Sequence, residues 1–198
     1  MEKPIKQEKS LVLSKKIPKG DKYIPEEWLK KLYQSIDNVR DKTYIMYHAE
    51  TGLRVTEVVN TEIVHVDWEN FRTYTYDFKK DKWRFIYFPE FVKAQLKQWL
   101  KQRQIEEIKD KKLFPFTEKT ANRILKKWCK EIDFPYANVV GSHWLRHTFI
   151  RLSQKTGRNI KAVQQNTGDT IETILGWYSD LSREDMKKEI EEKPMIKK

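Results

Sequence analysis

The spacing of apolar residues changes along the chain, and each change marks a different kind of secondary structure. Trp28, Leu29, Leu32 and Ile36 recur at helical spacing behind Pro25, a favourable residue at the start of a helix. Two shorter helical patterns follow at about 42–49 and 54–59, separated by a glycine. From 63 to 88 the apolar residues follow a strand pattern, and the polar turn at 79–82 predicts a β-hairpin.

Beyond position 89 the pattern returns to helical spacing. It predicts one helix at about 90–108, a second that begins after a cap at Thr117 or Thr120, and a third that runs from a cap at Ser142 to Gly157. Three further helices are predicted at 160–165, 170–181 and 183–192. The sequence therefore predicts a mainly α fold with one small antiparallel β-sheet, an α+β domain.

Charge narrows the choice of partner. The 198 residues hold 40 Lys+Arg against 29 Asp+Glu, a formal net charge of +11. With 38% hydrophobic residues the chain is too apolar for disorder, so surplus positive charge on a folded domain favours a polyanion such as nucleic acid. A heavily solvated surface rich in Lys and Glu explains the same charge equally well.

Composition also indicates the domain organisation and the compartment. Residues 1–22 are rich in lysine and lack periodicity, so we expect a basic arm or linker before a domain at 23–182 and a charged C-terminal helix and tail at 183–198. Cys129 is the single cysteine, which excludes an internal disulfide and a multi-cysteine zinc site. No apolar run has the length of a membrane-spanning helix, so we expect a soluble protein in the cytoplasm.

Three nitrogen-bearing side chains are predicted to share one helical face near position 143. His143, Arg146 and His147 stand at i, i+3 and i+4, away from the apolar stripe of the same helix. Histidines four apart are also half of a metal site, although no Glu lies between them and no third ligand is evident. Two ordinary capping or surface histidines are the simpler alternative.

Two further residues are candidates for phosphate chemistry. Arg54 stands at the start of a predicted helix, where a planar guanidinium suits binding of two phosphate oxygens, although a surface salt bridge to Glu57 or Glu50 fits equally well. Tyr178 continues the apolar stripe of the helix at 170–181, which by itself predicts a core position.

Taken in order, these segments resemble the catalytic domain of the tyrosine recombinases, the integrase family that includes phage integrases and Xer-type resolvases. Thr-Gly-Leu-Arg-Val-Thr-Glu at 51–57 resembles the first arginine box, and His-Trp-Leu-Arg-His-Thr-Phe at 143–149 resembles the His-x-x-Arg-His box. The hairpin at 79–89 resembles the one whose first turn lysine is catalytic in the family. That assigns the role to Lys79, with Lys80 and Lys82 as rivals.

The resemblance covers about 23–192 and reverses the interpretation of Tyr178, which stands where the family keeps its nucleophile. One departure concerns the family's Gly-His or Gly-Trp pair nine residues earlier, because here Gly168 is followed by Asp169. A carboxylate cannot donate to a phosphate unless it is protonated. We expect Asp169 to cap the helix at Thr170, or to take a proton from the nucleophile. The hydrogen bond that the family's His or Trp donates to the phosphate would then come from Trp177, from Asn166 or from no residue. The family's separate amino-terminal DNA-clamping domain does not appear in this sequence.

The resemblance implies a chemistry for these residues. Tyr178 attacks a DNA phosphodiester and forms a 3′-phosphotyrosine, Arg54 and Arg146 clamp the phosphate, His143 donates to it, and Lys79 protonates the leaving oxygen. His143 or His147 serves as the base, and neither a metal nor a cofactor is needed.

The resemblance also implies partners. The first partner is double-stranded DNA, in a prokaryotic host, a virus or a mobile element. The second is further copies of the chain, which would form a tetramer on paired DNA sites. The helix at 183–192 is a candidate segment for docking on a neighbouring copy. Two alternatives remain, namely a type IB topoisomerase and an inactive DNA-binding module.

Overall fold

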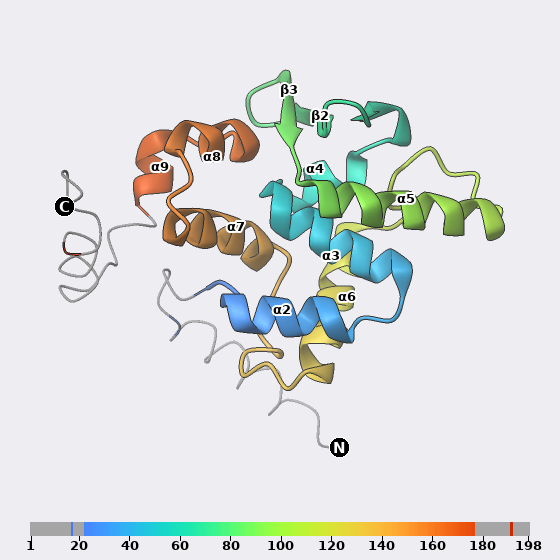
Figure 1. Ribbon diagram of the computed structural model, residues 1–198, viewed down its shortest axis with the longest axis horizontal. Coiled ribbons are helices and arrows are strands. Elements are labelled where there is room, and N and C mark those ends of the chain that lie inside the picture. Colours follow the sequence, from blue (N-terminus) through green and yellow to red (C-terminus); the bar gives the residue numbers. More distant parts are fainter. Residues whose placement is uncertain (1–16, 18–21, 177–190, 192–198) are drawn as a thin grey trace, which may run out of the picture.

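The computed structural model describes Ile17, residues 22–176 and Glu191. Its amino-terminal half contains helices α2 (Glu26–Ser35), α3 (Val39–Thr51) and α4 (Val55–Asn60), the 3-10 turn η2 (Ile63–His65), and strands β1 (Val66–Asp67), β2 (Arg72–Asp77) and β3 (Lys82–Tyr87). Helices α5 (Glu90–Ile105), α6 (Glu118–Glu131), α7 (His143–Lys155), α8 (Ile160–Thr167) and α9 (Ile171–Leu175) follow (Figure 1). The predicted fold class, mainly helical with a small antiparallel sheet, is confirmed.

The sheet carries its polar residues on the inner side. Its strands run in the order β1-β2-β3, all antiparallel, and Thr75 and Asp77 of β2 pair with Arg84 and Lys82 of β3. Thr73, Thr75 and Asp77 are buried, whereas Tyr74 between them is exposed. Because β2 packs on α4 and β3 on α8, the sheet directs a polar surface toward these two helices.

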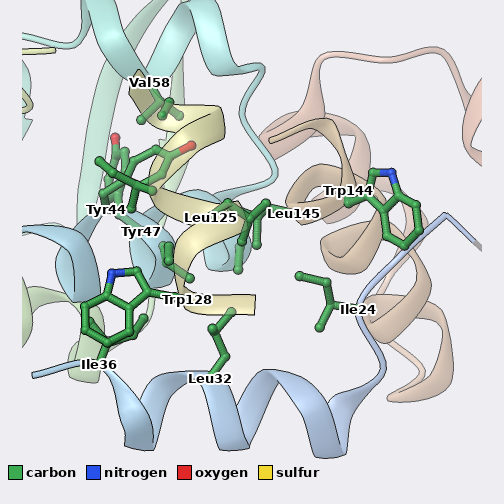
Figure 2. Close-up of a cluster of buried hydrophobic side chains, with 14 of the residues drawn as sticks. Ile24, Leu32, Ile36, Tyr44, Tyr47, Val58, Leu125, Trp128, Trp144 and Leu145 are labelled. Atoms are coloured by element: carbon green, nitrogen blue, oxygen red, sulfur yellow. The ribbon is translucent and has the colours of Figure 1, made fainter. Parts of the chain in front are cut away.

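Two apolar clusters hold the helices in place. The main cluster packs side chains of α2, α3, α6 and α7 around Leu32, Leu125 and Leu145, as Figure 2 shows. A second cluster, made by Phe149, Ile150, Val163 and Ile174, holds α8 and α9 on the carboxyl half of α7. Ile17, inside the predicted amino-terminal arm, is buried in the main cluster.

Some predicted boundaries were wrong, each for a local reason. Residues 63–65 form a 3-10 turn instead of a strand, and Val64 is 81% exposed, so its apolar side chain contributes nothing to the core. Helix α3 begins at Val39, before the predicted 42, because the side chain of Asn38 accepts a hydrogen bond from the Asp41 N–H. Ser142 precedes α7 but makes no side-chain cap, because its hydroxyl contacts Asn122 and Tyr44 instead.

Candidate active site

Arg54 is presented by a tight turn between α3 and α4. Gly52 ends α3 in the left-handed conformation at φ 67°, and a Cβ built there would lie 2.4 Å from the ring of Phe149, so glycine is required. Arg54 then occupies the N-cap of α4, and its backbone N–H donates to Oε2 of Glu57 at 2.7 Å. Its guanidinium is 29% exposed and also contacts Oε1 of Glu57 at 3.3 Å.

Arg146 reaches the same place from inside the protein. Its side chain is 9% exposed, and its guanidinium donates to the carbonyl of Gly52 at 2.6 Å and to that of Thr167 at 2.9 Å. Desolvation lowers the pKa of this guanidinium, and the carboxylate of Asp169 opposes the shift. Arg146 therefore ties the turn that carries Arg54 to the carboxyl end of α8.

Asp169 bridges the two arginines. Its Oδ1 accepts from Nη2 of Arg54 at 3.0 Å, and its Oδ2 lies 2.5 Å from Nη2 of Arg146. The prediction that Asp169 caps the helix at 170–181 was wrong, because the N-cap of α9 is Thr170, whose hydroxyl accepts from the Thr173 N–H. Thr170 satisfies the helix end locally, and the carboxylate of Asp169 instead follows the stronger attraction of two guanidinium groups.

A third arginine, which the sequence did not reveal as part of the site, completes the cluster. Arg84 on β3 is 8% exposed, and its Nη2 donates to both carboxylate oxygens of Glu57, at 3.0 and 3.1 Å. Its Nη1 donates to the carbonyls of Gln165 and Asn166 at the end of α8. The signal in the sequence was its register in the hairpin, on the polar inner face, but register alone does not say what lies opposite.

These side chains form one continuous arginine–carboxylate network. Within the part of the chain that the structure describes, its members are three arginines and three carboxylates, namely Arg54, Arg84, Arg146, Glu57, Asp77 and Asp169. Glu57 and Asp77 are each 1% exposed, whereas Asp169 is 15% exposed. The network is thus neutral as a whole. Its most exposed carboxylate, that of Asp169, lies between Arg54 and Arg146, the two residues predicted to bind the phosphate.

The hairpin turn brings a lysine to the network. Nζ of Lys80 donates to the carbonyl of Gly168 at 2.5 Å, directly before Asp169. The side chain of Lys79 is exposed, and its backbone N–H donates to Oδ1 of Asp77. Of the turn lysines, Lys80 has its ammonium group against the Gly168 loop, and the catalytic assignment to Lys79 stays a prediction.

The two histidines at the start of α7 pack against each other. The rings of His143 and His147 pack edge to face at 5.4 Å, and Nδ1 of His147 lies 2.9 Å from the carbonyl of Lys22. Desolvation and the positive charge of Lys22 lower the pKa of His143. Arg146 turns inward to the carbonyls of Gly52 and Thr167 while His143 is exposed, and the convergence of the three donors stays a prediction.

A buried histidine, which the sequence pattern did not single out, contacts the turn that carries Arg54. His48 is fully buried, and desolvation lowers its pKa to about 3, so its ring is neutral. Nε2 pairs with the carbonyl of Leu53 at 3.0 Å, and Nδ1 lies 3.2 Å from the hydroxyl of Tyr44. That hydroxyl lies 3.2 Å from the hydroxyl of Ser142, so one chain of hydrogen bonds connects the residues that precede Arg54 and His143.

Other predicted residues lie elsewhere. The side-chain amide of Asn166 is occupied by Tyr87, accepting from its N–H at 3.0 Å and donating to its carbonyl at 2.7 Å. This contact joins α8 to β3 and gives Asn166 a structural role, and its alternative role as the phosphate donor stays a prediction. Trp177, Tyr178 and the predicted tail helix at 183–192 lie outside the described residues, apart from Glu191. None of the described helices is long and apolar enough to cross a membrane.

The fold and the geometry thus define a mainly helical domain with a small β-sheet, in which two arginines from different helices share one carboxylate. The chain belongs to the phage integrase family, whose model matches residues 22–184. It is 28% identical over 187 residues to tyrosine recombinase XerC of Staphylococcus epidermidis, covering 86% of this chain and 62% of that protein. Tyrosine recombinase XerA of Pyrococcus horikoshii is 28% identical over 193 residues, covering 91% of this chain and 65% of that protein.

Solved structures agree with this assignment. The chain matches a crystal structure of XerA recombinase with a TM-score of 0.74 at 25% identity, over 86% of this chain and 64% of that chain. XerH site-specific recombinase bound to its difH substrate has the same fold, with a TM-score of 0.68 at 22% identity over 87% of this chain and 54% of that chain. The chain spans about three-fifths of the length of the curated relatives it matches.

Proposed function

We propose that this chain supplies the catalytic part of a site-specific recombinase that cleaves and rejoins DNA through a 3′-phosphotyrosine. The observation that carries the proposal is the meeting of Arg54 and Arg146, which come from different helices and bind the two oxygens of one carboxylate at 3.0 and 2.5 Å. Two guanidinium groups that hold a carboxylate in this way can hold two non-bridging phosphate oxygens in the same way.

In the proposed reaction, the hydroxyl oxygen of Tyr178 attacks the scissile phosphorus. The bond to the 5′-oxygen breaks, a 3′-phosphotyrosine forms, and a free 5′-hydroxyl leaves. Negative charge grows on the non-bridging oxygens during this step, so Arg54 and Arg146 stabilise the transition state more than the ground state. The 5′-hydroxyl of another strand later attacks the phosphotyrosine and reverses the step. Bond energies are conserved, so no nucleotide cofactor is consumed.

Buried carboxylates keep Arg54 ready for this role. Glu57 holds both the backbone and the guanidinium of Arg54, and Asp77 lies 3.5 Å from the same guanidinium. Since both carboxylates are almost fully buried, they fix the orientation of Arg54 before substrate binds.

Proton transfer is assigned to the hairpin and to the histidines at the start of α7. Lys79 protonates the leaving 5′-oxygen, with Lys80 as the alternative that its contact with Gly168 favours. The lowered pKa of His143 keeps its ring neutral at pH 7, which suits a base for the tyrosine proton or a donor to phosphate, and His147 and Trp177 are supporting candidates. The arginines supply the positive charge that a metal ion supplies elsewhere.

Double-stranded DNA is the proposed partner, held mainly through backbone phosphates by the surplus of basic residues. Among the structural neighbours, XerH is bound to difH and a lambda integrase tetramer is bound to a Holliday junction. We propose that this chain likewise acts as a homotetramer on paired DNA sites. The relatives come from bacteria and archaea, which supports a prokaryotic cytoplasm as the place of action.

The test is covalent capture on a nicked suicide substrate, which traps the phosphotyrosine because the cleaved fragment diffuses away. The natural chain should form adducts in excess EDTA, and Tyr178→Phe should form none while it keeps its DNA affinity. Adducts that persist in Tyr178→Phe would move the nucleophile, with Tyr136 the next residue to test. Relaxation of a supercoiled plasmid without recombinants would indicate a type IB topoisomerase, and DNA binding without any adduct would indicate an inactive module.

A further inference from the structure

The carboxylate of Asp169 presents the same pattern of acceptors to the arginines as a phosphodiester does. Each of its oxygens contacts a different guanidinium, Oδ1 at 3.0 Å from Arg54 and Oδ2 at 2.5 Å from Arg146. A phosphodiester likewise carries two non-bridging oxygens that share one negative charge. The donors that the proposed mechanism assigns to the scissile phosphate are therefore already engaged by a side chain of the protein.

The charge balance of the network singles out Asp169 as the replaceable member. Three arginines face three carboxylates, so the network is neutral with Asp169 in place and carries one positive charge without it. Glu57 and Asp77 are 1% exposed and bind backbone N–H groups as well as arginines, which fixes them in the protein. A single phosphodiester charge in place of the Asp169 carboxylate would restore neutrality.

The carboxylate of Asp169 is not tied to a helix end, so its side chain can rotate away from the arginines while the backbone keeps its own contact with Thr167. It follows Gly168, which ends α8 in the left-handed conformation at φ 70°, and it precedes the capping residue Thr170. Its side chain is 15% exposed, more than the 9% of its partner Arg146. The carboxylate is thus held mainly by the two guanidinium groups and not by a helix end.

We propose that Asp169 is an internal competitor of the substrate: its carboxylate occupies the phosphate position between Arg54 and Arg146 in the DNA-free protein and leaves it when the scissile phosphate binds. The proposal rests on the proposed function only in naming the DNA phosphate as the displacing group. Anion binding at the two arginines tests it without any cleavage.

The experiment measures sulfate binding to the full chain, by titration and by the shift of melting temperature, at constant ionic strength set with chloride. Asp169→Asn and Asp169→Ala should each bind sulfate at least tenfold more tightly than the natural chain, because the competing charge is gone. Glu172→Gln is the matched control, since it removes one exposed carboxylate three residues away and should leave sulfate affinity unchanged. In Asp169→Asn combined with Arg54→Gln, the gain should disappear.

Each other outcome overturns the proposal. Unchanged sulfate affinity in the folded Asp169 variants would show that the carboxylate does not occupy the anion position, as would an equal gain in Glu172→Gln. Loss of cooperative folding in both Asp169 variants would make the residue structural. A hundredfold fall in cleavage by Asp169→Asn at unchanged sulfate affinity would assign the carboxylate to proton removal from Tyr178. The sulfate result is independent of Tyr178, so repeating it in Tyr178→Phe separates failure of this inference from failure of the proposed function.

Discussion

Arg84 and Glu57 form a nearly buried ion pair in which one guanidinium nitrogen contacts both carboxylate oxygens, at 3.0 and 3.1 Å. Glu57 in turn holds Arg54, and Arg84 also donates to carbonyls at the end of α8, which carries Asp169 into the site. Arg84 is therefore the residue through which the hairpin, α4 and α8 are kept in one arrangement.

Replacing Arg84 should reduce the stability of the folded protein. Arg84→Gln leaves Glu57 and Asp77 buried with one fewer cation, so we expect a loss of about 3 to 5 kcal/mol in the free energy of unfolding. Arg72→Gln is the control, because Arg72 and Asp67 form a pair on the exposed side of the same hairpin, and it should cost less than about 1 kcal/mol. Urea unfolding of the two variants makes the comparison, and equal losses would refute the role of Arg84.

Removing either of the two arginines that we propose to bind the phosphate should slow cleavage strongly. Arg54→Ala and Arg146→Ala should each reduce the single-turnover rate about 10²- to 10³-fold, or roughly 3 to 4 kcal/mol, as for loss of one transition-state donor. Arg→Lys should restore little, since an ammonium group does not bind two oxygens as a fork. Arg54→Ala is the cleaner test, because Arg146 also ties Gly52 to Thr167. A wild-type rate in Arg54→Ala would make that arginine structural.

The turn lysines are separated by a substrate with sulfur at the 5′-bridging position. Since a thiolate leaves without a proton, this substrate should restore cleavage in the lysine variant that lacks the general acid. We expect Lys79→Ala to be the slowest of the three lysine variants and to be rescued, whereas the two rivals, Lys80→Ala and Lys82→Ala, should not be rescued. Rescue of Lys80→Ala instead would assign the role to the lysine that contacts Gly168.

His48 should make the folded state sensitive to acid. Its pKa is about 3 in the folded protein and about 6.5 when unfolded, so between these values only the unfolded chain binds the proton. Stability contributed by His48 is therefore complete above pH 6.5 and is lost as the pH falls toward 3. Between pH 7 and 4.5 the natural chain should lose about 2.5 kcal/mol more than His48→Gln, measured by urea unfolding at each pH. Parallel pH profiles for the two proteins would contradict this account.

Much of the fold was already determined by the sequence, because its signals are local. The apolar spacing behind Pro25, the glycine at 52 and the strand pattern within 63–88 each act over a few residues, so they predicted α2, the α3–α4 turn and the hairpin. The two arginine boxes were recognisable for the same reason, since each is a short run of residues. Boundaries failed where a single side chain decided them, as at Asn38, or where an apolar residue such as Val64 is not buried.

Only the tertiary structure decided which charges meet. Asp169 looked like a helix cap because Gly-Asp-Thr is a local start signal, yet Thr170 makes the cap and two arginines more than twenty residues away attract the carboxylate. Local patterns did not reveal the partners of Arg84 and His48, because these partners are brought to them by the packing of β3 on α8 and by the turn after α3. Electrostatic contacts act through space and not along the chain, so the network that defines the site exists only once the helices are packed.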